Sequence, residues 1–391
     1  MQRTAVLALA AALVLAACDD PTTGVSTRAE QPQRPLAALT PADGEVVMRD
    51  LNNPRGLTFG PDGALYVAEA GTGGPGPCYI IVRTQECYGP TGSVSRLWHG
   101  HQERVVTGLP SVAAKGGQAE GPNGIAMLGL GDAYVTIGLE GNPANRNAPQ
   151  LAGFGQLVRI SAAALRGNGA AHSGKAFEFR ADLGTYEARV NPDCGVLDSN
   201  PFGLLVEPGG VIVADAGANS LIRVSANGNL STLLAMSSRN TKPLAPNCPL
   251  PAGYPAVLPK ETVPTSVVKG PDGAYYIGQL AGVPLTIGAA KVFRFVPGSA
   301  PEVYLTGFTW IVSMTFDDAG NLYVLQFSDG PDSSFPGSLI RVAPDGARTT
   351  VVSGLHSPTG VAIGPDGGIY ISHWGQKFPK APLGEVLRFG P

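Results

Sequence analysis

The sequence predicts an all-β fold, a six-bladed β-propeller, from three observations: abundant turn residues, a strand motif that recurs six times, and a first strand that replaces a missing last one. The chain has 391 residues, of which 53 are Gly and 35 are Pro, without a collagen-like period. This composition favours short strands and frequent turns over long helices. With 27 Lys and Arg against 30 Asp and Glu and no run of like charges, the chain is not expected to bind nucleic acid.

Residues 1–18 predict an export signal. A basic start at Arg3 precedes an apolar run from Ala5 to Leu15, and Leu-Ala-Ala-Cys at 15–18 resembles the lipobox of bacterial lipoproteins. The resemblance implies that Cys18 carries a lipid and holds the protein on the bacterial membrane, facing the periplasm or the cell surface. The competing interpretation is an ordinary cleaved signal peptide in which Cys18 is incidental. Both interpretations imply export.

Four cysteines remain when Cys18 is set aside, and an even number suits disulfides in an oxidising compartment. Three pairings can be drawn, and proximity in the sequence favours Cys78 with Cys87 and Cys194 with Cys248. A zinc site is the alternative, but the chain has no Cys-x-x-Cys pair and only five His.

Residues 19–43, rich in Thr, Pro, Gln and Ala, predict a flexible tether, and residues 44–391 form the predicted domain. The domain repeats a strand of pattern small-x-aliphatic-x-Arg-apolar. Its Arg stands at six positions: Arg96, Arg159, Arg223, Arg294, Arg341 and Arg388. The shortest interval, 47 residues, is the length of four short strands with tight turns, which is one propeller blade. An Arg present in every blade is expected to pair with neighbouring backbone or carboxylate groups.

Each repeat follows the same order of strands, A to D. Strand A begins with Pro-x-Gly-aliphatic or a variant of it, at Pro54, Pro122, Pro201, Pro264, Ile311 and Pro358. Gly-Pro-Asp-Gly turns lead into strand B at 60–63, 270–273 and 364–367, and their Asp residues are expected to form the turns. Strand C carries the Arg, and strand D reads Val-Val-x-Gly-Leu at 105–109 and 351–355.

The last repeat ends after its strand C and lacks a strand D. Residues 46–51 parallel residues 351–355, so the first strand of the domain is expected to complete the last blade. Such closure leaves no open edge between the first and last blades.

Because strands A and B are antiparallel, the start of A and the end of B share one rim, where the long insertions also lie. Most residues at the strand-B end are polar and differ between blades, with Ile137 as the apolar exception. The binding candidates are Glu69, Asp215, Gln279, Gln326 and His373 at the ends of strand B, with Asn53, Trp310 and His356 beside strand A. This variety predicts one asymmetric ligand, whereas the alternative is that each side chain caps its own loop.

Several segments resemble the ScyD/ScyE family. They include Asn53-Pro-Arg-Gly-Leu, Gly60-Pro-Asp-Gly-Ala-Leu-Tyr-Val-Ala-Glu-Ala-Gly71, and the stretches 102–110, 153–159, 198–205 and 263–268. The resemblance covers residues 45–391 and implies the propeller fold, but the role of that family is not established and no catalytic residue carries over. The segment from Asp215 to Val224 also resembles an NHL repeat, a unit of propellers that mostly serve as binding platforms.

Glu120-Gly-Pro resembles the corresponding segment of gluconolactonase-type propellers, which hold one divalent metal in the central mouth. The resemblance implies a metal set of Glu120, Asn123, Asn200 and Asp215, although the accompanying motifs of those lactonases are missing here. Oxygen and amide ligands suit Ca²⁺ or Mg²⁺ better than zinc.

Two functions remain open at this point. The first is a membrane-tethered, monomeric propeller that binds a small molecule, a glycan or a protein on its looped rim. The second is a metal-dependent lactonase or esterase in which the ion polarises a carbonyl and His373 or an aspartate activates water. No P-loop, nucleophile elbow or His-Glu-x-x-His motif occurs, so an enzyme would have to use the rim.

Overall fold

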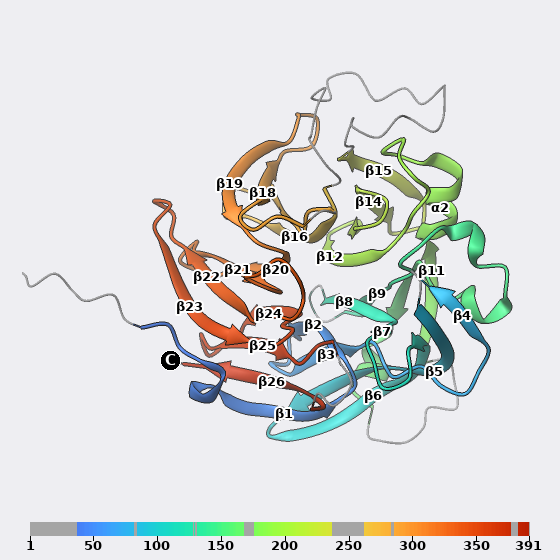
Figure 1. Cartoon of the computed structure of the whole chain (residues 1–391), viewed down its shortest axis with the longest axis horizontal. Helices are drawn as coiled ribbons and strands as arrows, with labels where there is room; N and C mark the ends of the chain where they lie inside the picture. Colours follow the sequence, from blue (N-terminus) through green and yellow to red (C-terminus); the bar gives the residue numbers. More distant parts are fainter. Residues whose placement is uncertain are drawn as a thin grey trace, which may run out of the picture. The chain divides into compact units, whose positions relative to one another are not determined.

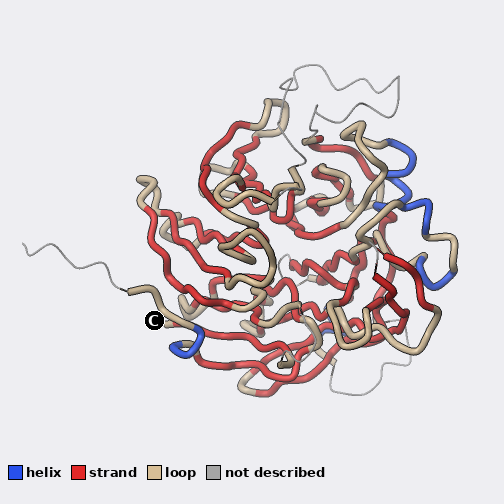
Figure 2. Tube along the Cα trace, viewed as in Figure 1, coloured by secondary structure: helices blue, strands red, loops and turns tan. Residues whose placement is uncertain are grey.

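Six antiparallel sheets follow one another along residues 38–391, and each forms one blade of a six-bladed β-propeller, as the sequence predicts. The structure, a computed structural model, describes residues 37–81, 84–127, 129, 131–167, 176–236, 262–282, 285–376 and 382–390. Strands dominate these residues, and the few helices are short (Figure 2). None of the helices in the described ranges is long and apolar enough to cross a membrane.

The blades are numbered from the first Pro-x-Gly strand. Blade 1 contains β2 (Pro54–Phe59), β3 (Leu65–Glu69), β5 (Thr84–Trp98) and β6 (His101–Ala113), with short β4 (Cys78–Ile81) and β7 (Ala119–Glu120). Blade 2 contains β8 (Pro122–Met127), β9 (Ala133–Ile137), β10 (Gln156–Ile160) and β11 (Phe177–Asp182). Blade 3 contains β12 (Pro201–Glu207), β13 (Gly210–Asp215), β14 (Ser220–Ser225) and β15 (Leu230–Ala235).

The remaining blades keep the same order of strands. Blade 4 contains β16 (Pro264–Lys269), β17 (Tyr275–Gln279), β18 (Ala290–Phe295) and β19 (Glu302–Phe308). Blade 5 contains β20 (Ile311–Phe316), β21 (Leu322–Gln326), β22 (Gly337–Val342) and β23 (Arg348–Leu355). Blade 6 contains β24 (Gly360–Ile363), β25 (Ile369–His373), β26 (Gly384–Phe389) and β1 (Glu45–Leu51). The helices are α1 (Ala162–Leu165) and α2 (Leu183–Val190), with 3₁₀ turns η1 (Pro41–Asp43), η2 (Pro143–Asn145) and η3 (Pro149–Leu151).

The first strand closes the last blade. β1 pairs antiparallel with β26, with Glu45 opposite Arg388 and Leu51 opposite Gly384, and the two strands lie side by side in Figure 1. The sequence therefore predicts the closure correctly. Leu39, which precedes the predicted start of the domain at residue 44, exchanges backbone hydrogen bonds with β23.

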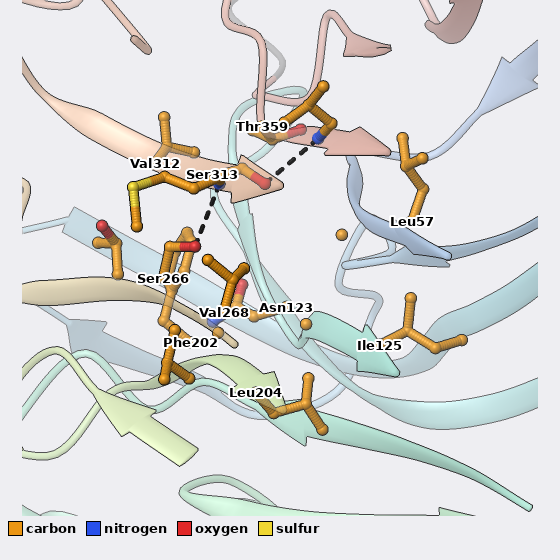
Figure 3. Close-up of a pocket in the computed structure, with 17 residues that line it drawn as sticks. Leu57, Asn123, Ile125, Phe202, Leu204, Ser266, Val268, Val312, Ser313 and Thr359 are labelled. Carbon is orange, nitrogen blue, oxygen red and sulfur yellow. Dashed lines mark hydrogen bonds between the residues drawn. The ribbon is translucent and has the colours of Figure 1, made fainter. Parts of the chain in front are cut away.

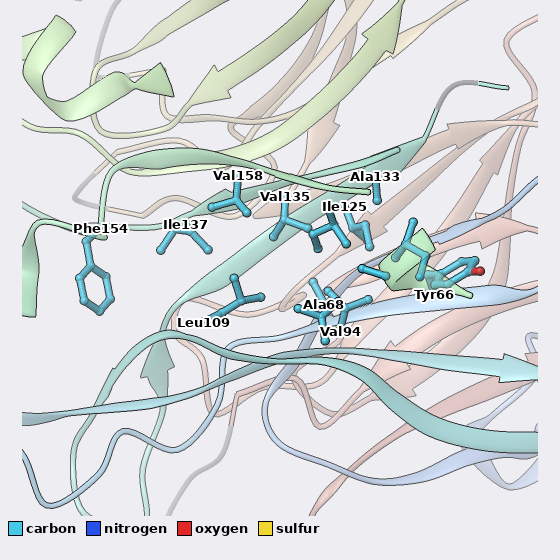
Figure 4. Close-up of a cluster of buried hydrophobic side chains, with 14 of the residues drawn as sticks. Tyr66, Ala68, Val94, Leu109, Ile125, Ala133, Val135, Ile137, Phe154 and Val158 are labelled. Carbon is cyan, nitrogen blue, oxygen red and sulfur yellow. The ribbon is translucent and has the colours of Figure 1, made fainter. Parts of the chain in front are cut away.

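The hydrophobic core is divided among the interfaces between neighbouring blades. One cluster of buried side chains lies at each interface, and Figure 4 shows the one between blades 1 and 2, which contains Tyr66, Leu109, Val135 and Val158. Both faces of a typical blade are thus covered by its neighbours. This explains why the strand-B residues Leu65–Glu69 are all buried rather than alternating between buried and exposed.

The Pro-x-Gly motif is explained by contacts between successive A strands. A Cβ on Gly124 would lie 2.5 Å from the Phe202 carbonyl oxygen, and one on Gly360 would lie 2.6 Å from the Arg55 carbonyl oxygen. Glycine is therefore required where one A strand closely approaches the next. The second residue of the Pro-x-Gly motif often forms a hydrogen bond to the neighbouring A strand, and the Thr359 hydroxyl, for example, donates to the Pro54 carbonyl at 2.7 Å.

The repeated Arg side chains are structural. Five of the six form ion pairs with carboxylates: Arg96 with Glu103, Arg159 with Asp132 and Glu178, Arg223 with Glu207, Arg294 with Asp272 and Glu302, and Arg388 with Asp366. The Asp residues of the Gly-Pro-Asp-Gly turns accept hydrogen bonds from backbone N–H groups of the same turn, as Asp62 does from the Ala64 N–H at 3.1 Å. These contacts confirm the structural role of the turn Asp residues and of five of the six Arg residues.

Cys78 and Cys87 form the predicted disulfide, which joins paired positions of the β4–β5 hairpin. Cys194 is also disulfide-bonded. Cys248, its predicted partner, lies outside the described residues, as do Cys18 and the whole predicted signal, so those assignments stay predictions.

Candidate functional site

The candidate site lies on the rim where strand A begins and strand B ends. Pro54 pairs with Glu69, Pro122 with Ile137, Pro201 with Asp215, Pro264 with Gln279, and Ile311 with Gln326. The long connections between strands B and C and between blades lie on this looped rim. Below it, the six A strands surround a cavity of about 110 Å³ (Figure 3). Apolar side chains, hydroxyls and the amide residue Asn123 line this cavity.

Most candidate side chains at the end of strand B are occupied by their own loops. Glu69 is fully buried and accepts from the Asn52 N–H at 2.6 Å, from two Ser hydroxyls, and from Arg104 in an ion pair at 2.8 Å. Gln326 accepts from the Thr309 N–H at 2.7 Å. We call such a side chain, which holds the loop before strand A, a latch.

Asp215 and His373 are latches as well. Asp215 accepts from the Asn200 and Ala218 N–H groups at 2.6 and 3.1 Å and from the Ser199 hydroxyl at 2.8 Å. Burial raises its pKa to about 6, and these hydrogen bonds oppose the rise. His373 Nε2 accepts from the His356 N–H at 2.9 Å, and Nδ1 contacts Glu385 at 2.9 Å. Burial lowers the pKa of His373, so its neutral ring holds the loop.

The other binding candidates are dispersed around the rim. Gln279 is buried, and its Oε1 has no hydrogen-bond partner among the described residues. Asn53 donates to the Gly71 carbonyl at 2.8 Å, and Trp310 stacks on Phe327 with centroids 6.0 Å apart. His356 lines a different cavity together with Trp374. The structure therefore does not bring all these candidates to one ligand.

Blade 2 differs because Ile137 stands at the latch position and has no polar group. At this place a Cβ on Gly138 would lie 2.5 Å from Glu120 Oε2, 2.6 Å from Asn123 Nδ2 and 2.8 Å from Asn200 Oδ1. Three polar atoms therefore approach Gly138 so closely that a larger residue does not fit without a shift. We call this arrangement the cradle.

The cradle contains an unpaired carboxyl oxygen. Glu120 is 8% exposed, and its Oε2 accepts no hydrogen bond from the described part of the chain. Asn123 Nδ2 donates to the Pro201 carbonyl at 3.2 Å, and Asn200 Oδ1 accepts from the Leu139 N–H at 3.3 Å. Burying a polar oxygen without a partner costs free energy, so such an atom in a polar recess is a candidate ligand contact.

Three further charged groups surround the cradle. Arg55 is 2% exposed and donates from Nη2 to the Ala119 carbonyl at 2.7 Å, while its Nε has no partner among the described residues. Burial lowers the pKa of Arg55, but attraction from Glu120 and Glu140 opposes this. Glu86 is buried as well, and burial raises its pKa to about 7, with a contribution from Glu140.

The carboxyl groups of Glu120 and Glu140 titrate together. Burial raises the pKa of Glu120 well above its ordinary value, and repulsion from Glu140 and Glu86 raises it further. Burial also raises the pKa of Glu140, but a hydrogen bond from Glu120 and attraction to Arg55 lower it. The pKa of Glu120 is therefore the more strongly raised of the two, and a single proton bound by the pair resides on Glu120.

The predicted metal set fits the cradle only in part. Glu120 and Asn200 direct oxygens toward it, as hard cations prefer. Asn123 presents its amide nitrogen, and both oxygens of Asp215 are hydrogen-bonded within the loop. Over the described residues, no group of three or more His, Cys, Asp or Glu is placed to hold a metal ion. We therefore derive no catalytic step through a metal.

Sequence reasoning missed Arg55, Glu86, Glu140 and Gly138. Two signals could have found them. Ile137 is the apolar member of an otherwise polar ring, and Arg55 is the charged residue at the x position of the Pro-x-Gly strands. Both exceptions fall next to the cradle. Glu140 and Glu86 lie in insertions, where no repeat position predicts their neighbours.

No family model matches the sequence, and no curated protein matches it. Among solved structures, a glucose dehydrogenase is similar with a TM-score of 0.51 and 16% identity over 89% of this chain and 99% of that chain. A protein of unknown function from Bacteroides thetaiotaomicron has a TM-score of 0.51 and 12% identity, over 90% and 74%. A calcium-binding regucalcin from Agrobacterium tumefaciens has a TM-score of 0.49 and 15% identity, over 90% and 95%. At these identities the likeness shows the fold, a six-bladed β-propeller, and no activity.

Proposed function

We propose that this protein is an exported, lipid-tethered propeller that binds a small polar molecule in the cradle at its mouth. The observation that carries the proposal is the buried, unpartnered Glu120 Oε2, which lies beside Gly138 together with Asn123 Nδ2 and Asn200 Oδ1. Export and anchoring through Cys18 rest on the signal at residues 1–18. A rigid ring that presents one asymmetric polar recess is a common setting for ligand binding.

The polar atoms of the cradle define the chemistry of the ligand. Glu120 Oε2 and Asn200 Oδ1 can each accept a hydrogen bond, and Asn123 Nδ2 can donate one. This mixed set suits a neutral group that both accepts and donates, such as a hydroxyl or an amide. Arg55 is attracted by the carboxyl groups of both Glu120 and Glu140, so its positive charge does not require a charged ligand.

Hydrolysis of an ester or lactone is the second candidate function, and the carboxyl pair favours it. The pKa of Glu120 is raised well above its ordinary value, which suits a general acid, and the neighbouring carboxyl of Glu140 is the candidate general base. His373, which the sequence nominates for activating water, is held by His356 and Glu385 instead. If the protein is a hydrolase, Glu120→Gln abolishes turnover of lactone or ester probes.

The test is a thermal unfolding screen of the chain without residues 1–18. The probes are hydroxyl, amide and lactone compounds, together with Ca²⁺, Mg²⁺, Mn²⁺ and Zn²⁺ compared with EDTA. A ligand at 100 times its dissociation constant stabilises the folded state by about 2.7 kcal/mol. The proposal expects a neutral organic probe to raise the melting temperature, and a response to an ion alone would favour the metal-dependent alternative.

A matched pair of glycine variants locates the binding. Gly138→Ala fills the cradle, whereas Gly141→Ala adds a methyl group on the same connection with nothing within 4 Å. Binding in the cradle is lost in Gly138→Ala and kept in Gly141→Ala. A probe that stabilises both variants equally binds elsewhere and contradicts the assignment.

We further propose that the chain is a monomeric member of the ScyD/ScyE family. The motifs at 53–57 and 60–71 support the family, and the closed ring leaves no sheet edge between the first and last blades for a second copy to pair with. Light scattering of the purified protein measures its mass in solution. A stable dimer would contradict the monomer.

A further inference from the structure

A second cavity of about 280 Å³ opens on the looped rim between blades 5 and 6. Three segments line it: the connection after β21, the loop between β23 and β24, and the residue after β25. Its lining residues are Ser333, Ser334, Phe335, His356, Ser357 and Trp374. We call it the aromatic cavity. It shares none of its lining residues with the cradle.

The aromatic wall is built by residues that the repeat does not require. Trp374 follows directly after strand B, where the other blades have Ala70, Gly138, Ala216, Leu280 and Phe327. Its side chain is partly buried, and His356 stacks on it with centroids 4.5 Å apart and planes 8° apart. Phe335, in the connection after β21, is 47% exposed. Large aromatic surface left in contact with water is more informative of binding than aromatic surface in the core.

The backbone around this wall is held in an unfavourable conformation. Trp374 has a φ of 56° and Ser357 a φ of 43°, both in the left-handed region. Hydrogen bonds from the Trp374 N–H to the His356 carbonyl and from the Gly375 N–H to the Ser357 carbonyl, each 2.9 Å, tie the two loops together. His373 also fixes the His356 N–H. Strained residues that the surroundings hold rigidly are often found at binding sites.

Polar groups in the cavity remain available for a ligand. In the part of the chain that the structure describes, the hydroxyls of Ser333 and Ser357 and the His356 ring nitrogens make no side-chain hydrogen bond. The Ser334 hydroxyl donates to Asp332 at 2.5 Å and keeps its lone pairs. None of the described lining residues is Asp, Glu, Lys or Arg, so these residues favour a neutral ligand.

We propose that the aromatic cavity binds the ring of one neutral sugar. A pyranose has an apolar C–H face that packs on aromatic rings, and its hydroxyls both donate and accept, as the Ser and His groups require. A volume of about 280 Å³ lies at the lower end of ligand pockets, which suits a single ring. A free monosaccharide and the terminal unit of a glycan present the same ring. This inference does not depend on the function proposed for the cradle.

Saturation-transfer NMR with methyl glycosides of glucose, galactose, mannose and N-acetylglucosamine tests the proposal on the mature protein. At least one of the four is expected to show transfer to its ring C–H protons. His356→Ala, which removes the stacked imidazole without changing a left-handed residue, weakens binding at least tenfold. Trp374→Ala abolishes it, and Trp98→Ala, at an exposed Trp in the β5–β6 hairpin, leaves it unchanged.

Circular dichroism of each variant separates loss of binding from loss of folding. If Trp374→Ala fails to fold, His356→Ala and Ser357→Ala still decide the question. Absence of transfer from all four glycosides at tens of millimolar overturns the proposal. So does transfer that persists in His356→Ala, or binding of the planar, hydroxyl-free probe indole in place of every sugar.

The two sites are distinguished by exchanging their variants. Gly138→Ala is expected to leave sugar binding unchanged, and Trp374→Ala to leave binding in the cradle unchanged. A disaccharide of the preferred sugar then identifies the source, because tighter binding than the monosaccharide indicates a glycan and equal binding a free sugar. Sugar binding that is lost in Gly138→Ala would place the sugar in the cradle and overturn the assignment to this cavity.

Discussion

Blades 1 and 2 use the same rim in opposite ways. In blade 1, Glu69 is a latch whose carboxylate is satisfied by backbone, hydroxyl and Arg104 donors. In blade 2 the latch position is Ile137, and the nearby carboxyl of Glu120 keeps an oxygen without a partner. The same residue type therefore has two roles. A carboxylate that completes the repeat stabilises the fold, whereas one left over where the repeat is broken is available for a ligand.

The same contrast appears in the charges. The Asp carboxylates of the Gly-Pro-Asp-Gly turns lie on the opposite rim, which we call the turn rim. Burial raises the pKa of Asp272 and Asp366, but hydrogen bonds from an Arg of strand C and from their own turns outweigh it, so both pKa values are lowered. At the cradle, three Glu surround one Arg, and burial raises the carboxyl pKa values. Raised carboxyl pKa values in a recess are more typical of functional sites than of structural ion pairs.

The largest expected effect is that the same substitution, Glu to Gln, changes the free energy of unfolding in opposite directions at two positions. Glu69→Gln removes the negative charge that pairs with Arg104, and it should lower the free energy of unfolding by about 3 kcal/mol. This value is at the lower end for breaking a buried ion pair, because the Arg104 side chain is 38% exposed. Glu120→Gln removes a carboxyl that is costly to ionise and raises stability at pH 7.5. Urea unfolding of both variants measures this. Loss of stability in both would remove the distinction between latch and cradle.

Glu86→Gln tests the raised carboxyl pKa values at the cradle. The folded pKa of Glu86 is about 7 against an ordinary 4.5, so the wild type is not penalised below about pH 4.5 and loses stability as the pH rises to 7. The variant should match the wild type at pH 4 and exceed it by about 2 kcal/mol at pH 8, at about 1.4 kcal/mol per pKa unit, reduced for partial solvation. Glu302→Gln, at a 64% exposed side chain, serves as the control. An equal difference at both pH values would contradict the assignment.

His373→Gln tests whether a latch depends on proton binding. Burial lowers the pKa of His373, so its contribution to the free energy of unfolding is complete above about pH 6.5 and is lost as the pH falls through the folded pKa. Once the ring is protonated, its Nε2 no longer accepts the hydrogen bond from the His356 N–H. Gln serves as the latch at position 326, so the variant should keep its stability on acidification. The expected difference in thermal unfolding between pH 7 and pH 5 is about 1 kcal/mol, the value of one hydrogen bond. His101→Gln, at an exposed position, should leave the pH dependence unchanged.

The fold could be predicted from the sequence because it is repeated. Six Arg-bearing strands, the Pro-x-Gly starts and the parallel between residues 46–51 and 351–355 each reflect a contact that every blade makes, and together they fix the number of blades and their closure. The predicted disulfide between Cys78 and Cys87 followed from proximity alone. Repetition makes local patterns predictive of the whole.

The site could be predicted only in part, because it lies where the repeat is broken. Glu120, Asn123 and Asn200 do meet, but the amide orientation of Asn123 is set by the Pro201 carbonyl, which no sequence pattern encodes. Asp215 has the expected place and a loop-holding contact instead of a free carboxylate. Variation of the residue type at the strand-B ends therefore identifies the looped rim, but it does not distinguish the latches from residues that are available for a ligand.

The smallest expected effect comes from the turn rim. Arg388 pairs with Asp366 and is 25% exposed, so Arg388→Met should lower the free energy of unfolding by only about 0.5–1 kcal/mol. The loss should shrink in 1 M NaCl, because salt screens an exposed pair, whereas the loss in Glu69→Gln should persist. Unfolding in low and high salt checks both. If Arg388→Met costs as much as Glu69→Gln, the ion pairs at the turns stabilise the ring as strongly as the buried latches, and stability would no longer separate one rim from the other.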